Sequence, residues 1–225
     1  MSGSVSFVIP VLNEQGRVAD LLSDLRQRYP LCELIVVDGG SRDATVVIAL
    51  PLCDQLLLGD RGRAHQMNLG GQVASLPYIF FLHADSCPGV SAVALDARLA
   101  QQPQWGFCRV RLSGQHWFLR IIAWFINQRS RLTAVATGDQ MMFVQKAVFE
   151  QTGGFDAIPL MEDVAYSKRL RRLSRPEIIP EPVVTSSRRW EEGGLVKTVV
   201  RMWLLRLGYF LGVAPSTLWR HYYGR

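Results

Sequence analysis

ELIVVDGGS, residues 33–41, is the stretch of sequence that decides the fold. Its apolar run ends in the carboxylate of Asp38, and a Gly-Gly turn follows at once. A short, continuous apolar run is typical of a strand buried on both faces, which is the situation of strands in parallel sheets. The pattern therefore predicts an inner strand of a parallel sheet with an aspartate at its carboxyl end.

Similar apolar runs recur along the first half of the chain and alternate with helical patterns. Asn13 is expected to cap a helix that Pro30 closes, and residues 63–74 have the pattern of a further helix. The remaining strands are predicted over residues 5–11, 52–58 and 78–82. This alternation indicates an α/β fold, with a mostly parallel central sheet covered by helices on both faces.

Polar side chains follow three of these strands where each strand ends. These groups are Asn13-Glu14, Asp38 and the pair His83 and Asp85. Because ligands of such sheets bind at the carboxyl ends of the strands, we expect the three groups along one edge. An alternative for the last pair is that Asp85 caps a helix beginning near Pro88. We favour a binding site because the three groups occur together.

Composition and charge fit one folded domain with an uneven surface. The chain has 225 residues, 48% of them apolar, and a formal net charge of +6. Residues 1–108 carry 7 basic and 10 acidic side chains (net −3), and residues 109–225 carry 18 and 9 (net +9). The basic half fits an anionic partner, although a solvated basic surface explains it equally well.

Nothing at the start of the chain predicts a targeting segment, and no stretch has the length and composition of a membrane span. The four cysteines have no CxxC spacing, so we expect reduced thiols in a cytoplasmic protein.

Five motifs in order carry a resemblance to a known family. They are VIPVLNE (8–14), ELIVVDGGSRDAT (33–45), GRAHQMNLGG (62–71), FLHADS (81–86) and GGFDAIPLMEDVAYSKRL (153–170). Together they resemble family 2 glycosyltransferases of the GT-A fold, most closely those associated with radical-SAM/selenodomain proteins. The resemblance implies a Rossmann-like domain over residues 1–190, with residues 1–108 binding a nucleotide sugar and residues 109–190 an acceptor. Residues 191–225 would form a helical extension, packed on the domain or at a membrane surface.

The resemblance also implies roles for residues on the donor side. Asp38 would accept hydrogen bonds from the nucleotide base, although Gly39 stands where the family commonly has a second acid. The remaining donor-site residues would line the nucleotide cleft or lie near the ribose and diphosphate: Pro10, Asn13, Glu14, Arg63 and Asn68.

FLHADS stands where the family carries a metal-binding DxD motif. Asp85 keeps the last carboxylate of that motif, and His83 replaces the first. We therefore expect Mn²⁺ or Mg²⁺ at Asp85. Direct coordination by the His83 imidazole would favour manganese, and a hydrogen bond from it to a phosphate or to Asp85 is the alternative.

In the family, an acidic pair at MED (161–163) supplies the base that takes the acceptor proton. We expect Asp163 to be this base and Glu162 its partner or substitute, because close like charges raise a carboxyl pKa. The alternative is that both acids merely occupy a first helical turn. Arg189 lies in an Arg-Arg-Trp segment that is similar to the QxxRW motif of processive members, and it would stabilise the leaving diphosphate. Ser186 replaces the glutamine of that motif, which argues against chain-polymerising synthesis.

Two aromatic and basic segments, residues 116–127 and 195–212, remain unassigned. In the second, five apolar residues share one helical face: Val196, Val200, Trp203, Leu204 and Leu207. We expect this face to pack into the core, with a homodimer contact or a membrane interface as alternatives. A lipid-linked acceptor at the inner face of the membrane would fit the last alternative.

The sequence thus predicts an inverting, metal-dependent transfer of a hexose from a nucleoside diphosphate sugar to an acceptor hydroxyl. A nucleotidyltransferase is one rival, but VIPVLNE offers no glycine-rich basic loop after the first strand. A non-enzymatic module for an anionic ligand or membrane surface is another, but it would not require acids at three strand ends. No nucleic-acid partner is expected, because no motif indicates one.

Overall fold

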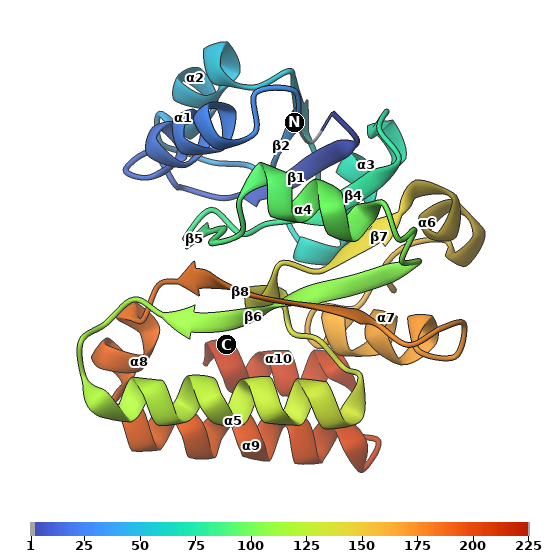
Figure 1. The fold of residues 1–225 in the computed structure, drawn as a ribbon. Helices are drawn as coiled ribbons and strands as arrows, with labels where there is room; N and C mark the ends of the chain where they lie inside the picture. Colours follow the sequence, from blue (N-terminus) through green and yellow to red (C-terminus); the bar gives the residue numbers. More distant parts are fainter. Residues whose placement is uncertain (1–2, 225) are drawn as a thin grey trace.

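A single eight-stranded sheet organises the chain, which the computed structural model describes over residues 3–224, with the backbone alone at residues 189, 190 and 192 (Figure 1). The strand order is β3-β2-β1-β4-β7-β6-β8-β5. The strands are β1 (Val5–Val11), β2 (Glu33–Asp38), β3 (Gln55–Leu58), β4 (Tyr78–Phe81), β5 (Ser86–Cys87), β6 (Trp105–Leu112), β7 (Phe143–Gln145) and β8 (Glu177–Thr185).

Ten α-helices and two short 3-10 turns connect the strands of the described chain. The helices are α1 (Val18–Arg28), α2 (Thr45–Ala49), α3 (Arg63–Val73), α4 (Ala92–Leu99), α5 (Trp117–Thr133), α6 (Lys146–Thr152), α7 (Glu162–Leu170), α8 (Arg188–Gly193), α9 (Leu195–Phe210) and α10 (Pro215–Tyr223). The 3-10 turns are η1 (Leu50–Leu52) and η2 (Gly138–Gln140).

The first four strands of the sheet are parallel, which confirms the predicted fold class. The register sets Val11 beside Asp38 and Asp38 beside Leu58, so β1, β2 and β3 end at one edge. β7 then pairs antiparallel with both β4 and β6, and β8 runs parallel to β6. The sheet therefore continues from the first half of the chain into the second without interruption.

Alternating side chains of β1 supply two core layers on opposite faces of the sheet. Phe7 and Ile9 pack with the apolar sides of α1 and α4, whereas Val8 packs with α3 and α6. Phe80 stacks on Phe143 with ring centroids 4.8 Å apart, which joins the two halves of the chain in one core. The sequence halves therefore form one domain.

Helix α3 is fixed tightly against the ends of β1 and β2. The buried Gln66 amide donates to the carbonyls of Val11 (2.9 Å) and Val37 (2.8 Å). Gly70 lets the helix approach the sheet, since a Cβ there would lie 2.4 Å from a methyl carbon of Val8. The start of α3 is thereby held at the edge where the strands end.

The predicted helix cap at Asn13 is wrong, and the alternative of a cap at Asp85 is excluded. Helix α1 begins after Arg17, and Asn13 instead lies in the loop with φ of 55°. Asp85 caps no helix either, because Ser91 caps α4 by accepting from the Ala94 N–H at 3.2 Å. Both residues thus lie in the loops that follow the strands.

The prediction that α9 packs its main apolar face into the core is also wrong. Helix α9 buries Leu205, which packs beside Met161 and Val164 of α7. The five residues assigned to the core face are exposed, at 51–65% of their surface. Hydrophobic periodicity found the amphipathic helix but could not tell which of its sides the domain covers.

Candidate active site

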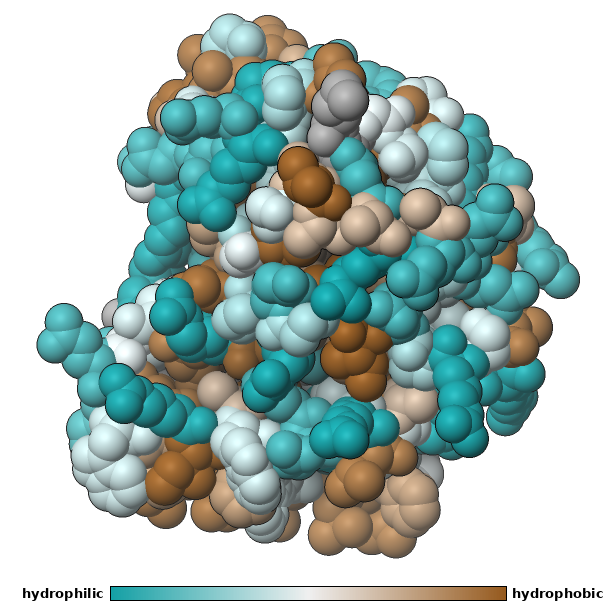
Figure 2. All heavy atoms as spheres, in the orientation of Figure 1, coloured by the Kyte–Doolittle hydropathy of each residue, from teal (hydrophilic) through white to brown (hydrophobic). Residues whose placement is uncertain are grey.

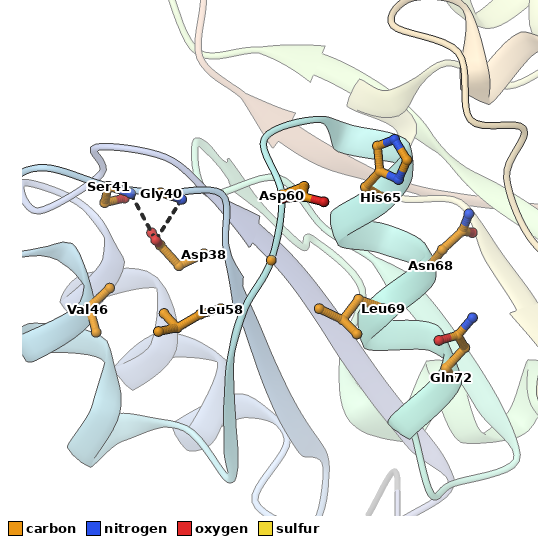
Figure 3. A pocket seen from close by; sticks show the side chains of 11 residues that line it. Asp38, Gly40, Ser41, Val46, Leu58, Asp60, His65, Asn68, Leu69 and Gln72 are labelled. Atoms are coloured by element: carbon orange, nitrogen blue, oxygen red, sulfur yellow. Dashed lines mark hydrogen bonds between the residues drawn. The ribbon is translucent and has the colours of Figure 1, made fainter.

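A hollow of about 910 Å³ opens where β2 and β3 end (Figure 3). Asp38, Gly40 and Ser41 form one side of it, and His65, Asn68 and Gln72 of α3 form the other. Asp60, just after β3, also lines it. The cavity thus lies at the carboxyl ends of the parallel strands, where the sequence predicted a ligand site.

Asp38 is almost fully buried in the wall of this cavity, at 2% exposure. Its Oδ2 accepts hydrogen bonds from the backbone N–H groups of Gly40 and Ser41, both at 2.8 Å. Its Oδ1 is buried without a hydrogen-bond donor among the described residues. A carboxylate oxygen left in this state is costly, and a hydrogen bond from a ligand N–H would relieve that cost.

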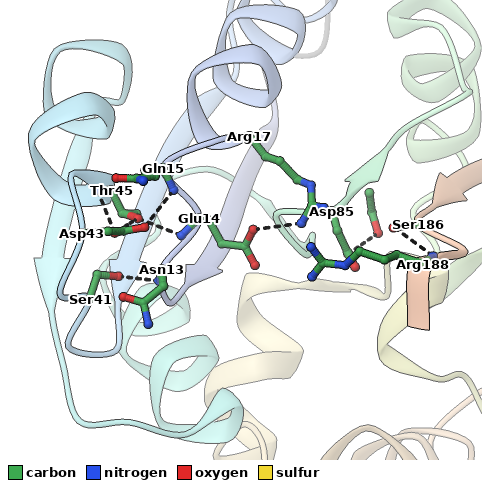
Figure 4. Close-up of polar contacts among 11 residues, drawn as sticks. Asn13, Glu14, Gln15, Arg17, Ser41, Asp43, Thr45, Asp85, Ser186 and Arg188 are labelled. Carbon is green, nitrogen blue, oxygen red and sulfur yellow. Dashed lines mark hydrogen bonds and ion pairs between the residues drawn. The ribbon is translucent and has the colours of Figure 1, made fainter. Parts of the chain in front are cut away.

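The loop after β1 is tied to the loop after β2 (Figure 4). Asn13 donates its backbone N–H to Ser41 Oγ and accepts from the Arg42 N–H, both at 2.8 Å. The Glu14 N–H donates to Thr45 Oγ1 at 2.8 Å, while its carboxylate lies 3.4 Å from Arg17. The predicted cleft residues Asn13 and Glu14 therefore brace the Asp38 turn.

Two further predicted donor-site residues have structural roles. Pro10 is buried within β1, beside Val37 in the register. Asn68 lines the cavity, but its amide clamps the backbone of Phe155, donating to the carbonyl at 2.8 Å and accepting from the N–H at 2.7 Å. The clamp fixes the Gly-Gly-Phe turn before α7 to helix α3.

His83 and Asp85 follow β4 at the same edge of the sheet. His83 lies against η2, since a Cβ built on Gly138 would be 2.4 Å from its Nε2. Asp85 is exposed, and its backbone carbonyl accepts the Ser186 N–H at 3.1 Å. The β5–β8 pairing thus brings the segment before α8 beside the Asp85 turn.

The side chain of Arg189 lies outside the described part of the chain, so its predicted role at the diphosphate stays a prediction.

The side chains around Asp85 suit a cation that is held largely by the phosphates of a bound nucleotide. No group of three or more histidine, cysteine, aspartate or glutamate side chains suited to a metal occurs among residues 3–224 as described. Asp85 nevertheless offers an exposed carboxylate, whose Oδ1 accepts from Ser86 Oγ at 3.3 Å. Magnesium at nucleotide sites is commonly held by one or two carboxylates together with substrate phosphates, and this arrangement meets that requirement.

Glu162 and Asp163 open helix α7 as an acidic pair, in which Glu162 is buried and Asp163 is half-buried. Burial, reinforced by the neighbouring Asp163 charge, raises the pKa of Glu162 to about 7. Burial also raises the pKa of Asp163, against the hydrogen bonds it accepts from the N–H groups of Gly138 (2.6 Å) and Val164 (2.7 Å). Carboxyl groups tuned in this direction are suited to accept a proton near neutral pH.

Two arginines from distant segments face this pair. Burial works against the charge of Arg63 at the start of α3, but the charges of Glu162, Tyr223, Asp139 and Asp163 together outweigh it, and the pKa of Arg63 is raised. Burial lowers the pKa of Arg129 on α5, although Asp163 and Asp139 counteract it. The site thus combines acids from α7 with cations from α3 and α5.

The structure brings most of the predicted residues to one edge. His83 contacts Gly138, which holds Asp163, while Arg63 faces Glu162 from the same helix that lines the Asp38 cavity. Sequence reasoning missed Asp60, Gln66 and Arg129. Asp60 follows β3 as Asp38 follows β2, so the same rule would have found it, whereas the roles of Gln66 and Arg129 depend on tertiary contacts.

Comparison with family models finds one match, in the first half of the chain. Residues 6–102 match glycosyl transferase family 2. This family 2 segment runs from β1 to the end of α4 and includes Asp38, Arg63 and Asp85. Sequence comparison with curated proteins gave no match.

The fold of the whole domain is similar to solved glycosyltransferase structures. One is residues 1–349 of S. aureus TarS in complex with UDP-GlcNAc, which aligns with a TM-score of 0.64 and 14% sequence identity. The alignment covers 81% of this chain and 58% of that chain. The mannosyltransferase PcManGT from Pyrobaculum calidifontis, in complex with GDP-Man and Mn²⁺, aligns with a TM-score of 0.59 and 19% identity, over 81% and 56%. The chain therefore spans less than two thirds of these proteins, and at this identity the likeness shows the GT-A fold.

The acidic pair predicts that Glu162→Gln stabilises the protein at high pH. The folded-state pKa of about 7 exceeds the ordinary value of 4.5, so the stability from Glu162 is complete below pH 4.5 and is lost as pH rises through 7. Glutamine does not titrate, so the variant should gain up to about 3 kcal/mol in unfolding free energy at pH 8 and almost nothing at pH 4. Urea denaturation at both pH values measures this.

Glu150→Gln on the exposed side of α6 is the matched control, and it should change stability by less than about 0.5 kcal/mol. An equal effect of Glu162→Gln at both pH values would contradict the raised pKa.

Proposed function

We propose that this protein is a glycosyltransferase that moves a hexose from a nucleoside diphosphate sugar to an acceptor hydroxyl with inversion. One observation carries the proposal: helix α3 lines a nucleotide-sized cavity that holds the buried Asp38 carboxylate, and Arg63 of the same helix faces an acidic pair whose pKa values are raised. The family 2 match on the donor side supports it.

In the proposed step the acceptor oxygen attacks the anomeric carbon as the bond from that carbon to the diphosphate oxygen breaks. Asp163 takes the proton of the acceptor hydroxyl, and the nucleoside diphosphate leaves with the bonding electrons. Glu162, whose pKa burial and the neighbouring Asp163 charge raise to about 7, would be its partner or substitute. A single displacement of this kind inverts the anomeric configuration.

The remaining residues would position the donor. Asp38 would accept hydrogen bonds from the base, and Arg63 at the N-terminus of α3 would face the diphosphate, where a helix start favours an anion. Asp85, with His83 beside it, would hold Mn²⁺ or Mg²⁺, which when bound supplies positive charge against the leaving diphosphate. The Mn²⁺ in the mannosyltransferase complex supports this choice.

The choice of donors to test comes from the ligands in the similar structures. The similar structures contain UDP, UDP-GlcNAc and GDP-Man, so uracil and guanine nucleotides are the first donors to test. No match supports the closer resemblance to transferases associated with radical-SAM/selenodomain proteins. The cytoplasmic location stays part of the proposal, supported by four free cysteines in the described chain.

The donor assignment predicts selective stabilisation by one nucleotide sugar. In a thermal-shift panel with Mn²⁺, the true donor at about 100 times its Kd should raise Tm by about 5–10 °C. Asp38→Asn should lose most of this shift, because the amide presents a donor where an acceptor is needed. Asp20→Asn on the exposed side of α1 is the control and should keep it. An unchanged shift in Asp38→Asn would remove Asp38 from the donor site.

The base assignment predicts that Asp163→Asn binds donor but transfers no sugar. Loss of a general base lowers turnover by about 10²–10⁴-fold, while the donor-induced Tm shift should stay close to that of the wild type. Release of nucleoside diphosphate measures turnover. Asp156→Asn, which changes an exposed aspartate paired with Arg169, should retain activity. Retained transfer in Asp163→Asn would place the base elsewhere.

The metal assignment predicts that Asp85→Ala removes the response to Mn²⁺. The donor-induced Tm shift measured with Mn²⁺ should fall to the value measured in EDTA, and turnover should fall by about 10²-fold or more. Full metal-dependent activity in this variant would refute the assignment.

A further inference from the structure

Helices α5 and α9 lie side by side at the end of the molecule away from β1–β3 (Figure 1). Together with the turn after α9, they carry 13 of the 20 exposed large hydrophobic side chains of the described residues. Three of these are tryptophans: Trp117 at 65%, Trp124 at 52% and Trp203 at 64% exposure. Figure 2 shows hydrophobic residues gathered at this lower end. We call this surface the α5–α9 face.

The exposed residues follow helical spacing, so each helix presents one continuous apolar stripe. On α5 the stripe includes Trp117, Ile121 and Trp124, and on α9 it includes Val200, Trp203 and Leu207. The opposite sides hold the helices on the domain, where Leu119, Ile122 and Val199 pack together. The α5–α9 face therefore points away from the domain, while the packed sides of the two helices hold it in place. Its exposed apolar patch is large for the surface of a soluble protein.

The charged side chains of the two helices themselves have a single sign. Residues 109–138 and 193–225 each contain five Lys or Arg and no Asp or Glu. Four of these cations are exposed on the two helices: Arg120 and Arg131 on α5, and Lys197 and Arg201 on α9. A symmetric contact with a second copy would set these like charges against each other. An anionic surface would instead neutralise them.

No helix within the described residues has the length and apolar composition to cross a bilayer. An amphipathic helix with an apolar stripe, flanking cations and tryptophans is the type that lies in the plane of a lipid interface. We propose that the α5–α9 face docks on the surface of an anionic lipid bilayer. This inference does not depend on the proposed transfer reaction.

Helix α9 also connects this face to the acidic pair. Its buried Leu205 packs with Met161 and Val164, which flank Glu162 and Asp163. Docking would therefore hold the pair within about one helix diameter of the lipid headgroups.

Vesicle flotation of the full chain tests the proposal. The protein should float with vesicles of phosphatidylcholine containing 30% phosphatidylglycerol about tenfold more than with phosphatidylcholine alone, and the difference should shrink in 0.5 M salt. The double variant Trp203→Glu/Leu207→Glu should lose at least about tenfold of this binding. Val47→Glu/Val93→Glu is the control, since it adds the same charge at two positions of 76% exposure outside the face and should still float.

Thermal melts establish that both double variants are folded. A folded wild type that stays at the bottom with anionic vesicles would overturn the proposal. An equal loss of vesicle binding in both double variants would also overturn it, because the loss would then follow from the change in net charge alone. A dimer in light scattering that Trp203→Glu/Leu207→Glu dissociates, without vesicle binding by the wild type, would assign the face to a second copy.

Discussion

The hydrogen bond from the Gly138 N–H to Asp163 Oδ2, 2.6 Å long, is the interaction on which the site depends. It joins the turn before β7 to the start of α7, and His83 after β4 packs on the same glycine. A Cβ at position 138 would lie 2.4 Å from the imidazole Nε2, so any other residue there would force the His83 ring to move. The antiparallel pairing of β4 with β7 brings these segments within reach of one another.

The acidic pair is held at an energetic cost. Burial disfavours the charged forms of both carboxyl groups, and the Asp163 charge further raises the cost of ionising Glu162. Arg63 and Arg129 offset part of this cost from two different helices. A fold selected only for stability would replace such a pair with apolar residues, so its presence favours a chemical role.

The strands of residues 1–108 could be predicted well, because each depends on a pattern within one short stretch of sequence. The strands β1 and β2 have the predicted bounds, since each is a compact and mostly apolar run. β3 begins at Gln55 rather than residue 52, because the preceding leucines form the 3-10 turn η1. The order of β5 to β8, the roles of Gln66 and Arg129, and the exposed side of α9 arise from contacts between distant segments, which periodicity does not encode.

A crystal structure of the protein with Mn²⁺ and the nucleotide sugar it binds would test the central claim most directly. The account predicts the base within hydrogen-bonding distance of the Asp38 carboxylate, the diphosphate between Arg63 and Asp85, and the anomeric carbon facing Asp163. A nucleotide seated away from the ends of β1–β4, or a sugar turned away from the acidic pair, would contradict it.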